Sequence, residues 1–475
     1  MTAAEPRALL LRDAEIEGQI VDVRIVEGRV AAIDPRGATP PGADRILDVA
    51  GGAVLPGLHD HHVHLLAMAA WASSIDVRGR DFDAAIATDH AQRPAGDWQR
   101  VVGYDETVTG PVDRHRLDAL APGRPVRVQH RSGALWILSS AALDQVLPDD
   151  GASSPAGVER DETGRPTGRL FRLDDWLGAR IPRTSPPDLE TVGRRLVARG
   201  VTGVTDATPT TDPADFLLIA QSVARRDLPI HVTVTGAPSL ASLAAPPPLL
   251  QGPVKVVITD HSLPALDDLE LWFDEAHRAG RNVAVHCVSD VALVLALAAW
   301  DEVGARPGDR IEHGAVVHPE HVARVAAHGL TVVTQPAFVF ASGDRYLADV
   351  DPVDVPYLYP CRSLQDAGVL VGGSSDAPFG PDDPWLAVAS AVERRTASGA
   401  VLGAGERVTP EVALSLFLSS AADPGGVPRT VEVGAPADLC VLDVARRRAL
   451  EDPANVAVRA TISDGDVVYL DEGSP

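Results

Sequence analysis

The stretch PGLHDHHVH places four histidines and one aspartate within six consecutive residues. In a β-strand alternate side chains share a face, so Asp60, His62 and His64 would point one way and His59 and His61 the other. His62 and His64 would then lie about 7 Å apart along the strand. At that spacing two imidazoles can bind one metal ion. Apolar residues precede and follow the stretch, which favours a buried metal site over a histidine-rich surface turn.

Three further residues with metal-binding side chains stand near the ends of short apolar runs. They are His286 in NVAVHCV, His313 in RIEHGAV and Asp376 in GGSSDAP. Taken singly, each has an ordinary structural explanation, because a buried histidine is often part of the core and an aspartate often caps a helix or closes a turn. Taken together, each ends a different predicted strand, which is where parallel barrels carry their catalytic groups. Imidazole and carboxylate ligands suit zinc first, and also manganese, iron or cobalt.

Lys255, in GPVKVVITD, is the only lysine of the chain, and every other basic side chain is arginine. A lysine in a buried strand is costly unless it is neutral or paired, and burial lowers the pKa of its amine. A neutral amine can add carbon dioxide and become a carbamate, whose two oxygens could bridge two metal ions. Arginine cannot do this, because its guanidinium stays protonated. The competing explanation is a lysine whose stem packs against apolar neighbours while its head reaches solvent.

These residues need a scaffold that brings several strand ends together. Eight short apolar runs are predicted strands, and segments with a helical pattern separate most of them. The runs are AVLPGLHDHHVH, GVTGVTDAT, IHVTVTG, VKVVITD, NVAVHCV, DRIEHGAV, LTVVTQPAF and VLVGGSSDAP. Alternating strands and helices imply a parallel sheet, and eight such units imply an α/β protein built on a closed (β/α)8 TIM-like barrel.

The spacing of the runs predicts how the chain divides into domains. About 130 residues separate the first run from the second, which is too long for a loop inside a compact domain. We therefore expect an inserted subdomain at residues 70–185, within a barrel at residues 55–424. Both ends of the chain contain short segments in which apolar and polar residues alternate, as in β-strands. Residues 1–54 and 425–475 are therefore expected to form one small composite β domain.

The overall composition argues against several classes of protein. With a formal net charge of −24, the chain is a poor candidate for binding nucleic acid or an anionic membrane. Its three cysteines are far apart and form no CxxC pair, so neither a disulfide framework nor a thiolate zinc site is indicated. No apolar run approaches the ~18 residues of a membrane span, and the N-terminus has no signal-peptide pattern. We expect a cytoplasmic protein that acts on a small molecule and could form a homo-oligomer.

Taken together, the motifs resemble those of the metal-dependent amidohydrolase superfamily. PGLHDHHVH is similar to its first-strand pattern PG-x-x-D-x-H-x-H, and the later residues follow in the family's strand order. Within the superfamily the chain most resembles the YtcJ-like branch, which includes N-substituted formamide deformylases, through stretches such as VVGYDETVTG and GSSDAPFGPDDPW. The resemblance implies two divalent metal ions, with a carbamate on the lysine as the bridge between them. The implied metal ligands are His62, His64, Lys255, His286, His313 and Asp376.

The resemblance also implies an activity. A metal-bound hydroxide would attack the carbonyl of a small amide, formamide or cyclic amide, and Asp376 would act first as general base and then as general acid. Three alternatives stay open: a mononuclear deaminase of the same fold in which Lys255 is not a ligand, an esterase or lactonase that uses the same site, and a binding protein without catalysis. Several positions depart from the family pattern, and the stretch RSGALWILSSAAL lacks a histidine and an asparagine that are usual in the branch. His59 stands where an apolar residue is usual, and Arg172 where an acidic residue is common.

Overall fold

The computed structural model of the chain describes residues 8–38, 45–94, 96–147, 155–181, 187–238, 240 and 249–471. The chain divides into two compact units. The larger unit comprises Met1–Leu65 and Leu189–Pro475, and the smaller one comprises Leu66–Asp188.

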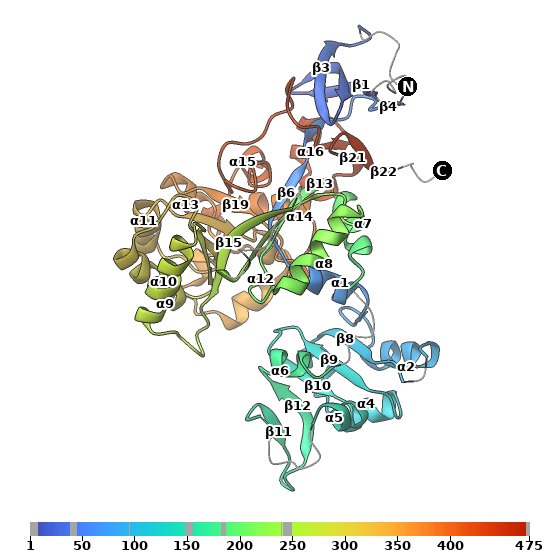
Figure 1. Ribbon diagram of the computed structural model, residues 1–475, viewed down its shortest axis with the longest axis vertical. Coiled ribbons are helices and arrows are strands. Elements are labelled where there is room, and N and C mark those ends of the chain that lie inside the picture. The colour runs from blue at the N-terminus through green and yellow to red at the C-terminus, as the bar shows by residue number, and fades with distance from the viewer. Residues whose placement is uncertain are drawn as a thin grey trace. The chain divides into compact units, whose positions relative to one another are not determined.

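The larger unit contains an eight-stranded parallel sheet that forms a nearly closed barrel (Figure 1). In order of pairing, its strands are β6 (Leu58–Val63), β13 (Val201–Asp206), β14 (His231–Gly236), β15 (Leu249–Val257), β16 (Val283–Cys287), β17 (Arg310–His313), β18 (Thr331–Thr334) and β19 (Val371–Gly373). Every residue of β6, β13, β17 and β18 is buried, as expected for strands covered on both faces. Each predicted run contributes one strand, so the predicted barrel of eight parallel strands is confirmed.

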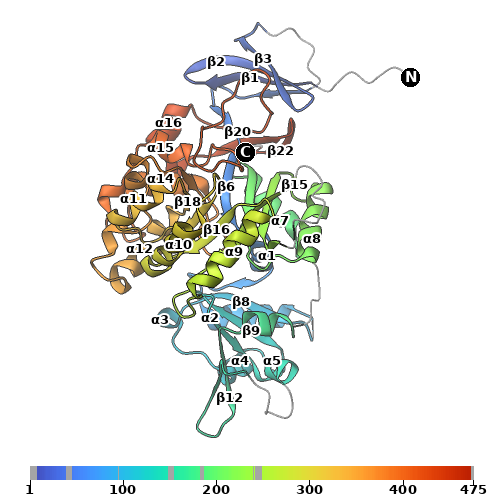
Figure 2. The same cartoon turned by 60° about the vertical axis from the view of Figure 1, so that its left-hand side comes forward.

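Helices separate most of the strands and pack outside the barrel, where α9 and α10 lie beside each other against β15 and β16 (Figure 2). They are α7 (Leu189–Val197), α8 (Pro213–Ala224), α9 (Leu266–Arg278), α10 (Asp290–Val303), α11 (Pro319–Ala327), α12 (Ala337–Asp349), α13 (Arg362–Asp366) and α14 (Pro384–Glu393). Polar caps fix where helices begin: the Ser289 side chain accepts from the N–H of Ala292 at α10, and the Asp383 side chain accepts from the N–H of Trp385 at α14. The segments that lead into these two helices contain candidate site residues, His286 on β16 before α10 and Asp376 in the loop before α14.

The seam between the first and last strands is closed by hydrogen bonds that involve the site residues themselves. The N–H of Asp376 donates to the carbonyl of His62 at 2.9 Å, and the N–H of His64 donates to the carbonyl of Ala377 at 2.9 Å. At the opposite end of the seam, the N–H of His59 donates to the carbonyl of Phe417 at 2.8 Å. Barrel closure therefore holds the histidine strand and the aspartate loop side by side.

Two four-stranded sheets complete the larger unit. One contains β1 (Ala8–Ile16), β2 (Gln19–Val26), β3 (Arg29–Pro35) and β4 (Arg45–Asp48); the other contains β5 (Val54–Pro56), β20 (Leu439–Leu442), β21 (Val458–Ser463) and β22 (Asp466–Leu470). Residues of both sheets, including Leu11, Ile25, Leu439 and Ile462, bury their side chains in one shared core. β5 leads directly into β6, so this core anchors the start of the histidine strand.

The smaller unit is built on a six-stranded mixed sheet. Its strands pair in the order β11 (Val158–Arg160), β12 (Pro166–Phe171), β10 (Leu135–Leu138), β9 (Val126–His130), β8 (Gln99–Tyr104) and β7 (Ile75–Asp76). Helices α2 (Phe82–Gln92) and α4 (Arg114–Leu120) supply apolar residues to its core. Across the described residues, every helix of the chain is too short or too polar for a membrane crossing.

Candidate metal centre

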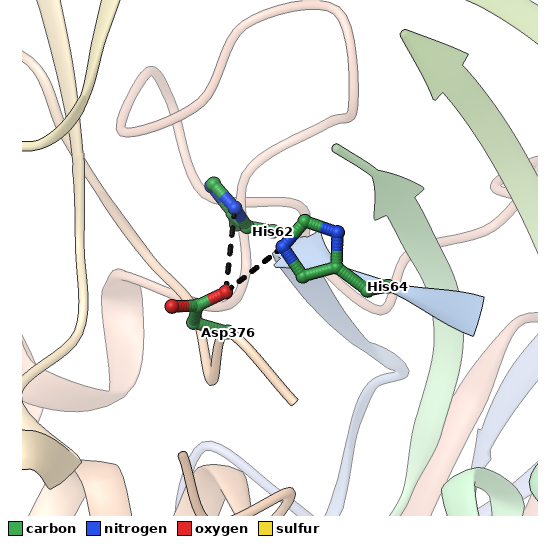
Figure 3. Close-up of side chains that lie close together, drawn as sticks. All are labelled: His62, His64 and Asp376. Atoms are coloured by element: carbon green, nitrogen blue, oxygen red, sulfur yellow. Dashed lines mark ion pairs between the residues drawn. The ribbon is translucent and has the colours of Figure 1, made fainter. Parts of the chain in front are cut away.

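His62, His64 and Asp376 form a cluster of potential metal ligands at the C-terminal end of the barrel (Figure 3). One ligand atom from each lies within 4.8 Å of the others. The Oδ1 atom of Asp376 is 3.1 Å from Nε2 of His64 and 3.5 Å from Nε2 of His62. Two imidazole nitrogens and a carboxylate oxygen at this separation make up much of the coordination shell of a divalent ion.

Each of the two histidines is oriented through its other ring nitrogen. Nδ1 of His62 lies 2.5 Å from Oε2 of Glu312, and Nδ1 of His64 lies 3.0 Å from the hydroxyl of Thr208. Burial, reinforced by the charge of Lys255, lowers the pKa of His62 well below its ordinary value. A neutral imidazole held by Nδ1 presents the Nε2 lone pair to a metal ion, an arrangement that recurs around metal-binding histidines.

His286 and His313 lie beside this cluster on neighbouring strands. His286 is on β16, and its ring centroid is 4.5 Å from that of His313, the last residue of β17. The His313 ring is in turn 4.8 Å from that of His62, and its Nδ1 lies 2.8 Å from Oε1 of Gln335. Burial, helped by the charge of Lys255, lowers the pKa of His286 to about 4. The structure thus brings all four predicted histidines together.

Lys255 projects from β15 into the interior of the barrel. Its side chain is 2% exposed, and Nζ has no hydrogen-bond partner among the described residues. Nζ lies 3.9 Å from Oε1 of Glu312, an atom that also accepts from Nε of Arg310 at 2.7 Å. Burial lowers the pKa of Lys255 to about 8, although the charge of Glu312 opposes the shift. The alternative in which the head of this lysine reaches solvent is therefore wrong.

Asp376 and His313 share an unusual backbone conformation. Their φ angles are 54° and 71°, in the left-handed region that costs a non-glycine residue about 1–3 kcal/mol. Such strain persists where the surroundings impose it, and it concentrates at functional sites. Burial would raise the pKa of Asp376, but the contact with His64 and the neighbouring His313 ring hold that pKa below its ordinary value. The carboxylate is ionised at neutral pH and available to a cation.

Glu312 is a residue of this centre that the sequence analysis did not identify. Strand alternation predicts that it points away from His313, yet both side chains reach the interior, because the backbone turns at His313 where the strand ends. Burial would raise the pKa of Glu312, but the charges of Arg310 and Lys255 keep it well below its ordinary value. A signal was available, since Arg310 and Glu312 stand two residues apart in an apolar strand and so share a face.

The two remaining histidines of the first strand are buried away from the cluster. Nε2 of His59 lies 3.1 Å from the hydroxyl of Thr205, and Nε2 of His61 lies 3.0 Å from the hydroxyl of Ser419. These contacts give both rings a structural partner. Asp60 accepts from the backbone N–H groups of His62 and Ser375, so it ties the first strand to the segment that carries the aspartate.

The donor set fits a divalent metal ion. Neutral imidazoles and an ionised carboxylate are the ligands that zinc and its neighbours prefer. Among the described residues, Oδ1 of Asp376 and Nζ of Lys255 are buried without a hydrogen bond. A buried polar atom left in this state costs about 1–3 kcal/mol. If the Asp376 carboxylate bound a cation, the cost of burying its Oδ1 atom without a partner would be removed.

Replacing Glu312 with glutamine is expected to weaken zinc binding roughly 10- to 100-fold, the usual effect of losing a group that orients a metal-binding histidine. The amide keeps the size of the side chain but loses the negative charge that faces Nδ1 of His62 at 2.5 Å. Competition with a chromophoric chelator measures the affinity. Thr208→Val is the matched control, because it removes the weaker neutral contact to His64 and should cost less. Unchanged affinity in Glu312→Gln would contradict the orienting role.

The chain has recognisable relatives along most of its length. It is 27% identical to the N-substituted formamide deformylase of Arthrobacter pascens, over 95% of both chains. It is 25% identical to YtcJ of Bacillus subtilis over 73% of this chain and 74% of that protein. Among solved structures, an uncharacterized metal-dependent hydrolase from Pyrococcus horikoshii OT3 has the same fold, with a TM-score of 0.77 at 19% identity over 94% of this chain and 99% of that chain.

A family model also matches the chain. The model of the amidohydrolase family aligns with residues 45–469, which include the whole barrel and every residue of the candidate centre. The match spans most of the chain rather than a single motif. This chain belongs to the amidohydrolase family.

Proposed function

We propose that this enzyme hydrolyses a non-peptide C–N bond of a small amide, most readily an N-substituted formamide, at a centre of two divalent metal ions. The observation that carries the proposal is the convergence of four histidines, one ionised aspartate and one buried lysine at the C-terminal ends of the barrel strands. The formamide class is supported by the Arthrobacter pascens relative, which aligns along 95% of both chains. The residues that would hold the ions are His62, His64, Lys255, His286, His313 and Asp376.

The proposal includes a carbamate on Lys255. A pKa of about 8 leaves about one amine in ten neutral at pH 7, against about one in 3,000 at the ordinary value of 10.5. The neutral amine nitrogen would attack carbon dioxide, form the N–C bond and release one proton. The product is an anion with two oxygens, placed where the unmodified amine makes no hydrogen bond among the described residues. A bridging anion of this kind lets one side chain serve two ions.

The other residues of the centre would transfer protons and hold the metal-binding histidines in position. Bound ions would supply an activated water and polarise the substrate carbonyl. Asp376 is ionised, and its carboxylate lies among the histidine rings, so it can take a proton from the attacking water and return it to the leaving nitrogen. The overall reaction would convert one amide and one water molecule into a carboxylic acid and an amine. Glu312 and Gln335 would hold His62 and His313 in position.

A mononuclear deaminase of the same fold is the second candidate. It is favoured by the cluster of potential ligands, which consists of His62, His64 and Asp376 without Lys255. In that case the lysine would stay an amine, and its role would be to balance the charge of Glu312 at 3.9 Å. We propose, in either case, a small-molecule substrate, no nucleic-acid or membrane partner, a cytoplasmic location and a capacity to form a homo-oligomer.

Removal of the metal tests the function directly. Protein treated with a chelator should lose turnover of N-substituted formamides and regain it with zinc, manganese, cobalt or ferrous iron. Circular dichroism before and after chelation shows whether the fold survives. Two ions per chain, measured by elemental analysis, support the binuclear centre, and one ion supports the deaminase alternative. Failure of every ion to restore turnover of any amide in a protein that stays folded would contradict the proposal.

A further inference from the structure

A half-exposed aromatic side chain stands directly beside the candidate centre. Phe379 is 46% exposed, although it follows Asp376 by only three residues. Its ring meets that of His64 edge to face, with centroids 5.5 Å apart. The N–H of Phe379 donates to the carbonyl of Asp376 at 2.9 Å, so the aromatic residue is fixed to the aspartate loop. A large, half-exposed apolar side chain is thus in direct contact with a candidate metal ligand.

A pair of packed aromatic rings lies next to the following residue of the loop, Gly380. The rings of Phe338 and Tyr359 are 5.5 Å apart, and both are buried. Gly380, next to Phe379, lies against Phe338, since a Cβ atom added there would be 3.3 Å from the Phe338 ring. Tyr359 is bound to the loop after β17 by its N–H, which donates to the carbonyl of Ala315 at 2.8 Å. Both rings come from the segment between β18 and β19, and these contacts join them to the loops that follow β17 and β19.

Tyr359 is held in a strained conformation. Its φ angle is 45°, in the left-handed region, as in His313 and Asp376. The buried guanidinium of Arg394 donates to the carbonyls of Tyr359 and Leu358 at 2.8 and 2.6 Å and so enforces this conformation. For a bulky residue this region is a genuine outlier, and strain of this kind is kept where position matters. The ring pair is therefore held in a fixed position beside Gly380.

We propose that Phe379 is a specificity-determining residue that packs against an apolar substituent of the substrate amide. The inference rests on the proposed function and deepens it by naming the substrate class: neutral amides with a bulky aliphatic or aromatic group close to the scissile bond. The group would lie on the open face of Phe379 while the amide carbonyl faces the ligand cluster. Aromatic contacts of this kind contribute beyond simple burial and favour edge-to-face or offset geometry.

Binding of two hydroxamic acids to the zinc-loaded protein tests the inference without relying on turnover. Acetohydroxamic and benzohydroxamic acid present the same metal-binding group and differ in a methyl against a phenyl. We expect the wild type to bind the phenyl compound roughly tenfold more tightly, and Phe379→Ala to reduce that preference to less than about threefold. Phe379→Leu should keep part of it. Isothermal titration calorimetry gives the dissociation constants.

Phe340→Ala is the matched control. Phe340 is also on α12, is 38% exposed and lies two positions beyond Phe338, which places it on another side of the helix. Its removal should leave the phenyl preference unchanged. An undiminished preference in Phe379→Ala, or an equal loss in Phe340→Ala, would overturn the inference. If neither hydroxamic acid binds the zinc-loaded wild type, the proposed metal centre itself is wrong and the inference falls with it.

Discussion

Lys255→Ala is expected to remove most of the bound metal and to lower kcat by more than the 10- to 100-fold that is typical for loss of an outer-shell group. The reason is that the proposed carbamate is shared by both ions, so its loss weakens both sites at once. The position is buried, and the shortened side chain leaves a gap next to Glu312 and Arg310. Elemental analysis of metal content and kcat on an N-substituted formamide check the two parts of the prediction separately.

The gap left by Lys255→Ala also offers a test of the chemistry. A short-chain carboxylic acid such as formic, acetic or propionic acid could enter it and supply the two bridging oxygens. Partial recovery of both metal content and kcat is expected, with a dependence on the size of the acid. Lys255→Arg is the matched control, because it keeps the positive charge but cannot form a carbamate. If Lys255→Arg retains wild-type metal content and kcat, the residue acts as a cation and the bridging role is wrong.

The barrel could be predicted from the sequence because its strands are buried on both faces. Such strands appear as short, nearly continuous runs of Val, Ile and Thr, and helical patterns between them leave few other architectures. The ligand residues stand at or near the ends of these runs, so placing the runs also placed the residues. β17, for example, ends at His313.

Other parts of the centre depend on local backbone geometry that alternation does not encode. Glu312 and His313 are adjacent in sequence, and a regular strand would separate their side chains, but the left-handed φ angle of His313 directs both inward. Asp376 likewise stands beyond the last residue of β19, and the hydrogen bond between its N–H and the carbonyl of His62 at 2.9 Å positions it. Contacts across more than 300 residues of sequence cannot be predicted from local pattern.

The neighbouring strand β13 explains why a histidine can stand at position 59, where the family pattern usually has an apolar residue. A Cβ atom added to Gly203 would lie 2.4 Å from Nδ1 of His59, so only glycine leaves room for the ring. Thr205, two residues further along β13, then supplies a hydroxyl to Nε2 at 3.1 Å. A histidine is tolerated at a usually apolar position because one neighbour provides space and another provides a polar partner. Each of these residues is unremarkable when read alone in the sequence.

Asp376→Asn is expected to lower kcat by roughly 10²- to 10⁴-fold, the range that general acid–base groups contribute. The amide keeps the shape of the carboxylate but cannot accept a proton from the attacking water or return one to the leaving nitrogen. KM should change much less, because Phe379 and the four histidines around the substrate are unchanged. The variant is expected to fold, since the N–H of residue 376 can still donate to the carbonyl of His62.

The two proposed roles of Asp376, ligand and base, make different predictions for the same variant. If ligation dominates, metal content falls together with kcat, and excess zinc restores both. If proton transfer dominates, the variant binds near wild-type amounts of zinc and kcat stays low at saturating metal. Asp383→Asn is the matched control, because Asp383 caps α14 only seven residues further on and asparagine caps a helix equally well. A variant at position 376 with full metal content and wild-type kcat would place the base elsewhere, and Glu312, which is buried beside His62, would be the next residue to test.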